Sequence, residues 1–103
     1  MIRVDIRPRA TGKTHDLIER CARANGIIVC GSKAEAERIK NMAKDMKVDI
    51  NEPNVFRPEL LRGLAHHKLY IDNLDSIIQS LFPNHKIDTV TMSNSIYENR
   101  LEE

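Results

Sequence analysis

Apolar residues along this chain recur with two different periods, and the two periods alternate from the N-terminus onward. Ile2, Val4 and Ile6 are separated by polar residues, and this two-residue period predicts a strand with one buried face. The run from Ile27 to Cys30 is wholly apolar, which is typical of a strand covered on both faces. Two further strands are predicted, over 68–72 and 86–92.

Helical spacing fills the intervals between these strands. Apolar residues recur every three or four positions over 14–24, 33–46 and 74–82. Asn25-Gly26 is a natural helix stop, and Ser32 with Glu35 predicts a capping box at the start of the second helix. The inner face of that second helix is expected to carry Ala36, Ile39, Met42, Ala43 and Met46.

Three short segments complete the pattern. Val55-Phe56 predicts a brief strand, and Pro58 begins a helical turn over 58–62. The polar tail carries Ile96, Tyr97 and Leu101 at spacings that one helical face could bury. Together the elements predict a single α/β domain over residues 1–103, with a mostly parallel sheet of about four or five strands and helices on both faces.

Length and composition agree with one globular domain. The chain has 103 residues, of which 41% are hydrophobic and 30% charged. No apolar run approaches the roughly 18 residues that span a bilayer, and the N-terminus lacks the layout of a signal peptide. A cytoplasmic protein without a membrane partner is therefore predicted.

Net charge and cysteine spacing bear on two further functions, nucleic-acid binding and metal or redox chemistry. The net charge is +1, so bulk charge gives no case for nucleic-acid binding. Arg3, Arg7 and Arg9 could contact nucleic acid locally, although phosphate attraction or plain solvation explains them equally well. Cys21 and Cys30 are not at metal-ligand or redox spacing, which predicts two reduced, buried thiols.

The turn between the first strand and the first helix carries the main candidate site. It reads Arg7-Pro8-Arg9-Ala10-Thr11-Gly12-Lys13-Thr14. Backbone N–H groups of such a turn and of the helix start can bind phosphate oxygens, and a glycine lets the chain curl around the anion. The alternative is an ordinary strand-to-helix turn with a capping threonine.

This turn resembles the Walker A motif, with Arg7 where the first glycine would stand. Variant loops of the form Arg-x-x-Gly-Lys-Thr occur in viral packaging ATPases. The resemblance implies that Lys13 reaches the β and γ phosphates and that the Thr14 hydroxyl binds Mg²⁺. The expected nucleotide contacts are Arg9, Ala10, Thr11, Gly12, Lys13, Thr14 and His15.

The strand Leu69-Tyr70-Ile71-Asp72 ends in a carboxylate and resembles a Walker B motif. The resemblance implies that Asp72 supports Mg²⁺ together with Thr14. Alternatively, Asp72 caps the helix that begins near Leu74. Asn73 stands where helicase-type motors have a glutamate, and an amide can hold a water but cannot accept its proton. Asp72 and Asn73 are thus the catalytic candidates, and slow or absent hydrolysis is predicted. Asp75 could substitute for the missing glutamate, or be a solvated first-turn carboxylate.

Polar residues after the last predicted strand complete the resemblance. Ser93 and Asn94 are similar to the strand end that senses the γ phosphate in helicases, although plain turns have such ends too. Residues 55–63 loosely resemble the segment before the acidic box of motor domains. As a whole, the chain resembles a minimal RecA-like motor domain of helicases and phage terminase large subunits. That resemblance implies a three-layer P-loop fold in which strand 2–6 neighbours 86–92, then 68–72, with 27–30 beyond.

The expected function is binding of Mg²⁺ and ATP or another nucleoside triphosphate, with weak or absent ATPase activity, in a phage-like or mobile-element accessory protein. A lone core of this kind cannot close on a second domain, which predicts a homo-oligomer or a protein partner. The competing hypothesis is a non-catalytic motor-domain mimic that docks on a host or viral ATPase or nuclease. Direct nucleic-acid binding through the N-terminal arginines is a third interpretation. The adjacent His66 and His67 lack a ligand partner at metal spacing and are interpreted as solvated.

Overall fold

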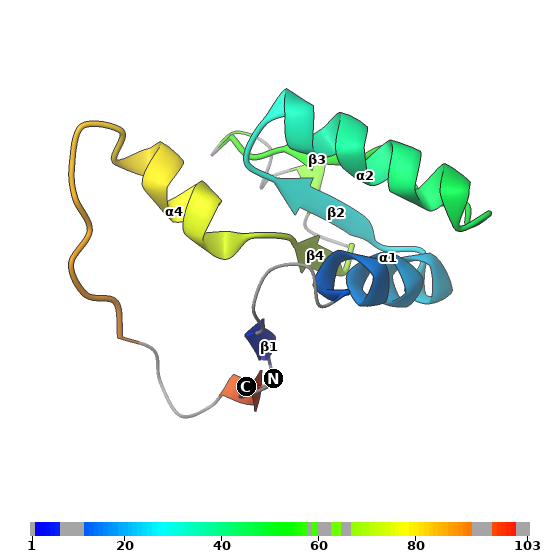
Figure 1. Ribbon diagram of the computed structural model, residues 1–103, viewed down its shortest axis with the longest axis horizontal. Coiled ribbons are helices and arrows are strands. Elements are labelled where there is room, and N and C mark those ends of the chain that lie inside the picture. Colours follow the sequence, from blue (N-terminus) through cyan, green and yellow to red (C-terminus); the bar gives the residue numbers. More distant parts are fainter. Residues whose placement is uncertain are drawn as a thin grey trace.

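A computed structural model shows an α/β arrangement of short parallel strands and amphipathic helices (Figure 1). It describes residues 2–6, 12–57, 59, 63–64, 67–91 and 96–100. The elements, in chain order, are β1 (Ile2–Ile6), α1 (Lys13–Ala24), β2 (Ile27–Cys30), α2 (Lys33–Asp45), β3 (Asn54–Val55), β4 (Leu69–Ile71), α4 (Leu74–Leu81) and β5 (Ile96–Arg100).

The central sheet has three parallel strands in the order β3-β2-β4. The middle strand β2 is buried along its whole length, as its wholly apolar sequence predicted. Pairing of Ile27 with Leu69 and of Val29 with Ile71 places β4 directly beside β2. The predicted neighbourhood of strand 27–30 and the acidic strand is therefore confirmed.

Helix α1 ends where the sequence predicted, and the cause is local. Asn25 adopts a left-handed conformation with φ 51°, which asparagine tolerates better than most residues. The N–H of Gly26 then donates to the carbonyl oxygen of Cys21 at 3.0 Å, closing the last turn. The chain can therefore enter β2 immediately after the helix.

Gly26 is fixed by close packing, which leads to a stability prediction. A Cβ atom at this position would overlap the Tyr70 ring and lie 2.9 Å from the carbonyl oxygen of Lys68. That oxygen is held in place because it accepts a hydrogen bond from the N–H of Ile27. We expect Gly26→Ala to lower the free energy of unfolding by about 1–3 kcal/mol, the usual cost of overpacking, as measured by urea denaturation.

Gly63→Ala is the matched control for Gly26→Ala. No atom in the described part of the chain lies within 4 Å of a Cβ built at Gly63, so this substitution should change stability by less than about 1 kcal/mol. Equal unfolding midpoints for the two variants would contradict the packing described around Gly26.

Helix α2 begins and packs as predicted. The Ser32 hydroxyl accepts a hydrogen bond from the N–H of Glu35 at 3.2 Å, which caps the first turn. Ala36, Ile39 and Ala43 are buried on the inner face of the helix. Helices α1 and α2 contact each other, and their inner faces form one core with β2. Its buried members are Ile18, Cys21, Ile28, Cys30, Ala36, Ile39 and Ala43.

The sheet is smaller than the sequence predicted. Strand β1 pairs in parallel with β5, from Ile2 with Ile96 to Ile6 with Arg100, and these two strands form a separate sheet. The prediction of a helical face in the tail is wrong for 96–100. Isoleucine and tyrosine at its start favour a strand, and β1 offers a partner of equal length.

The predicted strand over 86–92 is wrong for the described residues 86–91, which are irregular and exposed. Ile87 and Val90 are three positions apart, so a strand would point them to opposite faces. Their side chains are 36% and 57% exposed, and this segment instead loops away from the core beyond α4 (Figure 1).

None of the helices in the described part of the chain is long and apolar enough to cross a membrane.

Candidate functional site

The start of α1 forms the first half of the site. Gly12 precedes the helix in a left-handed conformation with φ 84° and ψ 15°, which glycine adopts without strain. Its carbonyl oxygen accepts from the N–H of Asp16 at 3.0 Å, and it has no side chain to cap the helix. The first-turn amides of a 12-residue helix beginning at Lys13 can therefore receive an anion.

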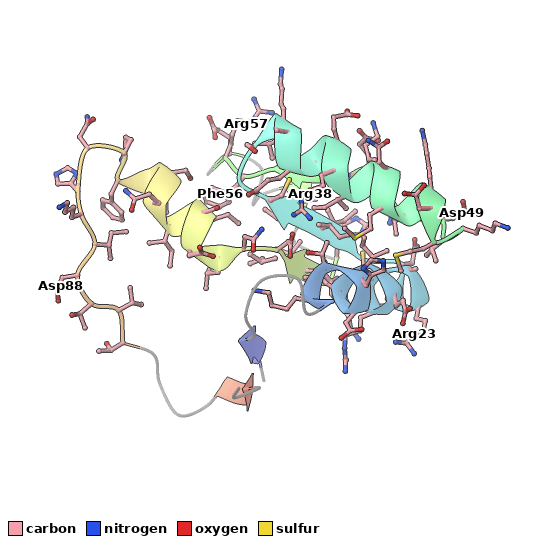
Figure 2. The ribbon with its side chains drawn as sticks, in the orientation of Figure 1. Arg23, Arg38, Asp49, Phe56, Arg57 and Asp88 are labelled. Carbon is pink, nitrogen blue, oxygen red and sulfur yellow. The ribbon has the colours of Figure 1, made fainter. Side chains whose placement is uncertain are left out.

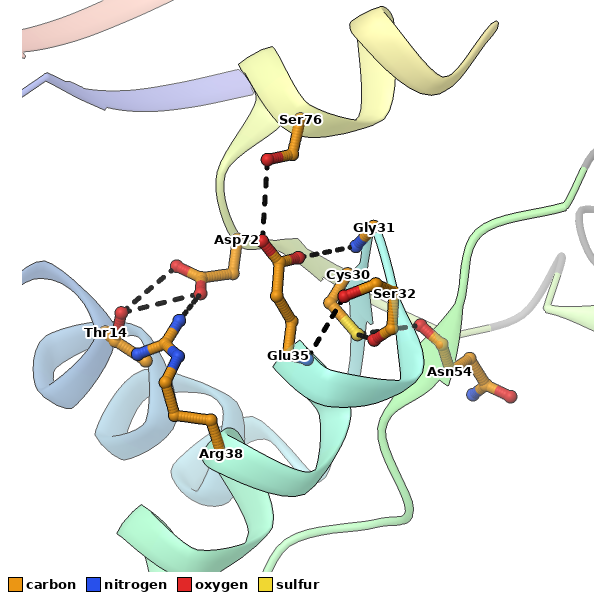
Figure 3. Close-up of polar contacts among 9 residues, drawn as sticks. All are labelled: Thr14, Cys30, Gly31, Ser32, Glu35, Arg38, Asn54, Asp72 and Ser76. Atoms are coloured by element: carbon orange, nitrogen blue, oxygen red, sulfur yellow. Dashed lines mark hydrogen bonds and ion pairs between the residues drawn. The ribbon is translucent and has the colours of Figure 1, made fainter. Parts of the chain in front are cut away.

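The end of β4 supplies the second half. The N–H of Asp72 donates to the carbonyl oxygen of Val29 at 3.0 Å, so the ladder between β2 and β4 continues to this residue. The hydroxyl of Thr14 lies 3.3 Å and 3.4 Å from the two carboxylate oxygens of Asp72, close enough to donate a hydrogen bond (Figure 3). Two residues 58 positions apart, each predicted as a magnesium ligand, thus meet.

Asp72 is the only charged residue that is buried in the described part of the chain, with 4% of its surface exposed. Burial raises the pKa of its carboxyl group, and the Arg38 guanidinium and the Thr14 hydroxyl partly offset this rise. Lys13 also lowers the pKa of Asp72 by its positive charge, while Glu35 raises it. A buried carboxylate in this setting favours additional positive charge.

Arg38 is a member of the site that sequence reasoning missed. It projects from α2, and one guanidinium nitrogen lies 3.4 Å from Oδ2 of Asp72 (Figures 2 and 3). The Arg38 side chain is 46% exposed, whereas that of Asp72 is 5% exposed. Nothing in the local sequence marks Arg38, because it is one of several charged residues on the outer part of an amphipathic helix.

Glu35 links three elements beside Asp72. One carboxylate oxygen accepts from the N–H of Gly31 at 2.9 Å, and the other lies 3.4 Å from the Ser76 hydroxyl of α4. The capping box predicted from Ser32 and Glu35 is thus present in its first half. In the usual capping box Glu35 would accept from the N–H of Ser32, the N-cap residue. Here it accepts from the N–H of Gly31, one residue earlier, and also contacts α4. Glu35 thus connects α2 with the residue that follows β2 and with the first turn of α4.

Backbone conformation, as well as chemistry, explains why asparagine and not glutamate stands at position 73. It precedes α4 with φ 55° and ψ 65°, in the left-handed region that asparagine enters more readily than glutamate. Its side chain makes no capping hydrogen bond to the helix. Asp75, in the first turn of α4, is exposed.

The two cysteines are buried free thiols, as predicted. Burial raises the pKa of Cys21 and of Cys30, which disfavours their thiolate forms. The Cys30 sulfur lies 3.5 Å from the carbonyl oxygens of Ser32 and Asn54, in an interior position. These thiols are core residues.

The remaining candidates divide into two groups. Gly12, Lys13 and Thr14 lie together at the start of α1. His15 follows them in the first turn of this helix and is exposed. The other predicted nucleotide contacts lie outside the described residues: Arg9, Ala10, Thr11, Ser93 and Asn94.

The oxygen donors present fit Mg²⁺ better than a transition metal. Thr14 and Asp72 offer a hydroxyl and a carboxylate, and Mg²⁺ is usually held by one or two such groups with phosphates and waters. Within the described part of the chain, no three histidine, cysteine or acidic residues cluster as a metal cage. Any metal here would therefore take most of its ligands from a bound phosphate group and from water.

No protein-family model, curated protein or solved structure matches this chain.

Proposed function

We propose that this protein binds ATP or a similar nucleoside triphosphate together with Mg²⁺, at the start of α1, within a P-loop fold. The observation that carries the proposal is the contact between Thr14 and Asp72. A hydroxyl at a helix N-terminus and a carboxylate at the end of a parallel strand are the two protein groups that such a magnesium-phosphate site needs.

The charges around this contact support the same proposal. The helix start offers backbone N–H donors, Lys13 adds a cation, and Asp72 favours positive charge close to its carboxylate. Phosphates would lie toward the amides and Lys13, and Mg²⁺ toward Thr14 and Asp72. Asn73 cannot take a proton from water, so hydrolysis is expected to be slow or absent.

Thermal melting with and without Mg-ATP tests the proposal. At 100 times the dissociation constant, bound ligand adds about 2.7 kcal/mol of stability, which for a domain of this size is an upward shift of about 10 °C or more. An unchanged melting temperature at millimolar Mg-ATP would count against a nucleotide site.

The second candidate function is a docking protein that acts without chemistry. It is favoured by the large apolar side chains that are exposed on β4, α4 and the segment after α4: Leu69, Ile71, Leu74, Leu81, Phe82, Ile87 and Val90. Exposed apolar side chains that gather in one patch are typical of contacts with another protein. A biological effect that survives loss of nucleotide binding would favour this function over the first.

A further inference from the structure

Arg38 and Mg²⁺ would compete for the same atom. The guanidinium lies 3.4 Å from Oδ2 of Asp72, on the carboxylate that the proposed function assigns to the metal. Thr14 contacts both oxygens of the same carboxylate. The carboxylate of this buried residue is therefore already shared between two donors, Thr14 and Arg38 (Figure 3).

Asp72 and Arg38 differ in how far they are buried. Asp72 is held at the end of β4 by its backbone hydrogen bond to Val29, and its side chain is 5% exposed. Arg38 stands on a long side chain that is 46% exposed, so its head group can leave the carboxylate and remain solvated. An ion pair of this kind, half in solvent, contributes little to stability and is easily exchanged.

We propose that Arg38 is a built-in competitor of Mg²⁺ for Asp72 and thereby sets the Mg²⁺ concentration at which nucleotide binds. The inference rests on the proposed nucleotide site. When Mg²⁺ binds with the phosphates, the Arg38 guanidinium would leave Oδ2 of Asp72 and move into solvent. Arg38 therefore acts as a positioning residue that tunes metal affinity through Asp72.

The test is a Mg²⁺ titration of ATP binding, followed with a ribose-labelled fluorescent ATP at fixed concentration. We expect Arg38→Gln to lower the Mg²⁺ concentration for half-maximal binding by about fivefold or more, at the lower end of couplings between interacting ligands. Arg38→Lys keeps the positive charge but loses the planar guanidinium. Its Mg²⁺ concentration for half-maximal binding should therefore lie between those of the wild type and of Arg38→Gln. Arg23→Gln is the matched control, because Arg23 lies on exposed α1 surface away from Arg38 and its loss changes net charge equally (Figure 2).

Each outcome decides between the two proposals. A lowered Mg²⁺ requirement in Arg38→Gln with no change in Arg23→Gln supports the competition. An unchanged or raised requirement in Arg38→Gln overturns it and leaves the nucleotide site intact. Failure of the wild-type chain to bind the labelled ATP at any Mg²⁺ concentration overturns both. If Arg38→Gln does not fold, Arg38→Lys decides alone, and a requirement equal to that of the wild type overturns the competition.

Discussion

Lys13→Ala should weaken ATP binding by about 10- to 100-fold, because a charge-assisted hydrogen bond to phosphate contributes about 1.5–3 kcal/mol. Lys13 is the first residue of α1, and its positive charge already acts on Asp72. The free energy of unfolding without ligand should change by less than about 1 kcal/mol. Lys13 is partly exposed, so replacing its side chain removes few buried contacts. Titration of a fluorescent ATP and a ligand-free melting curve measure the two quantities.

Lys44→Ala is the control for this prediction. Lys44 is an exposed lysine in the last turn of α2, and its replacement changes the net charge by the same amount. Nucleotide affinity should remain at the wild-type value. If Lys13→Ala and Lys44→Ala bind ATP equally well, the turn before α1 is not an anion site. The same pair of variants separates the two functions, because a docking protein keeps its biological effect in Lys13→Ala.

Asp72→Asn should have opposite effects on metal binding and on stability. The amide keeps the shape of the carboxylate and can still accept from Thr14, but it carries no charge for Mg²⁺. The Mg²⁺ concentration needed for half-maximal ATP binding should rise by about tenfold or more, as is common when support around a metal is lost. Isothermal calorimetry at several Mg²⁺ concentrations measures this shift.

The free energy of unfolding should be equal to or higher than that of the wild type, within about 1 kcal/mol. Burial raises the pKa of Asp72 above its unfolded value, so the ionised carboxylate is a net cost at neutral pH, and its stabilising protonated form is lost as pH rises. The difference between Asp72→Asn and the wild type should therefore shrink in acid, where both folded and unfolded carboxyl groups are protonated. A large loss of stability at pH 7 would instead assign Asp72 a structural role through its ion pair with Arg38.

The site also limits what chemistry the protein can perform. Asn73 is at once the residue that cannot act as a base and a residue suited to the left-handed backbone before α4. The other carboxylate close to Asp72 is Glu35, and its oxygens already contact the Gly31 amide and the Ser76 hydroxyl. If the protein binds a nucleotide as proposed, both observations predict slow or absent hydrolysis.

Local sequence was sufficient for the elements whose signals are complete within a few residues. The stop at Asn25-Gly26, the cap at Ser32 and the buried run of β2 depend on backbone conformation and burial that these residues impose themselves. Local sequence failed in the last quarter of the described chain. Ile87 and Val90 suggested a strand although their spacing suits no single face, and 96–100 formed a strand because β1 was available as a partner.

The candidate site divides in the same way. The sequence by itself predicted a Gly-Lys-Thr helix start and an acidic strand end, because glycine, lysine, threonine and aspartate stand at characteristic places within each segment. Only the tertiary structure decided that Thr14 touches Asp72, that Glu35 joins α2 to α4, and that Arg38 shares the buried carboxylate. Contacts across 34 to 58 residues depend on how parallel strands align their ends, and no local pattern in a single sequence records that alignment.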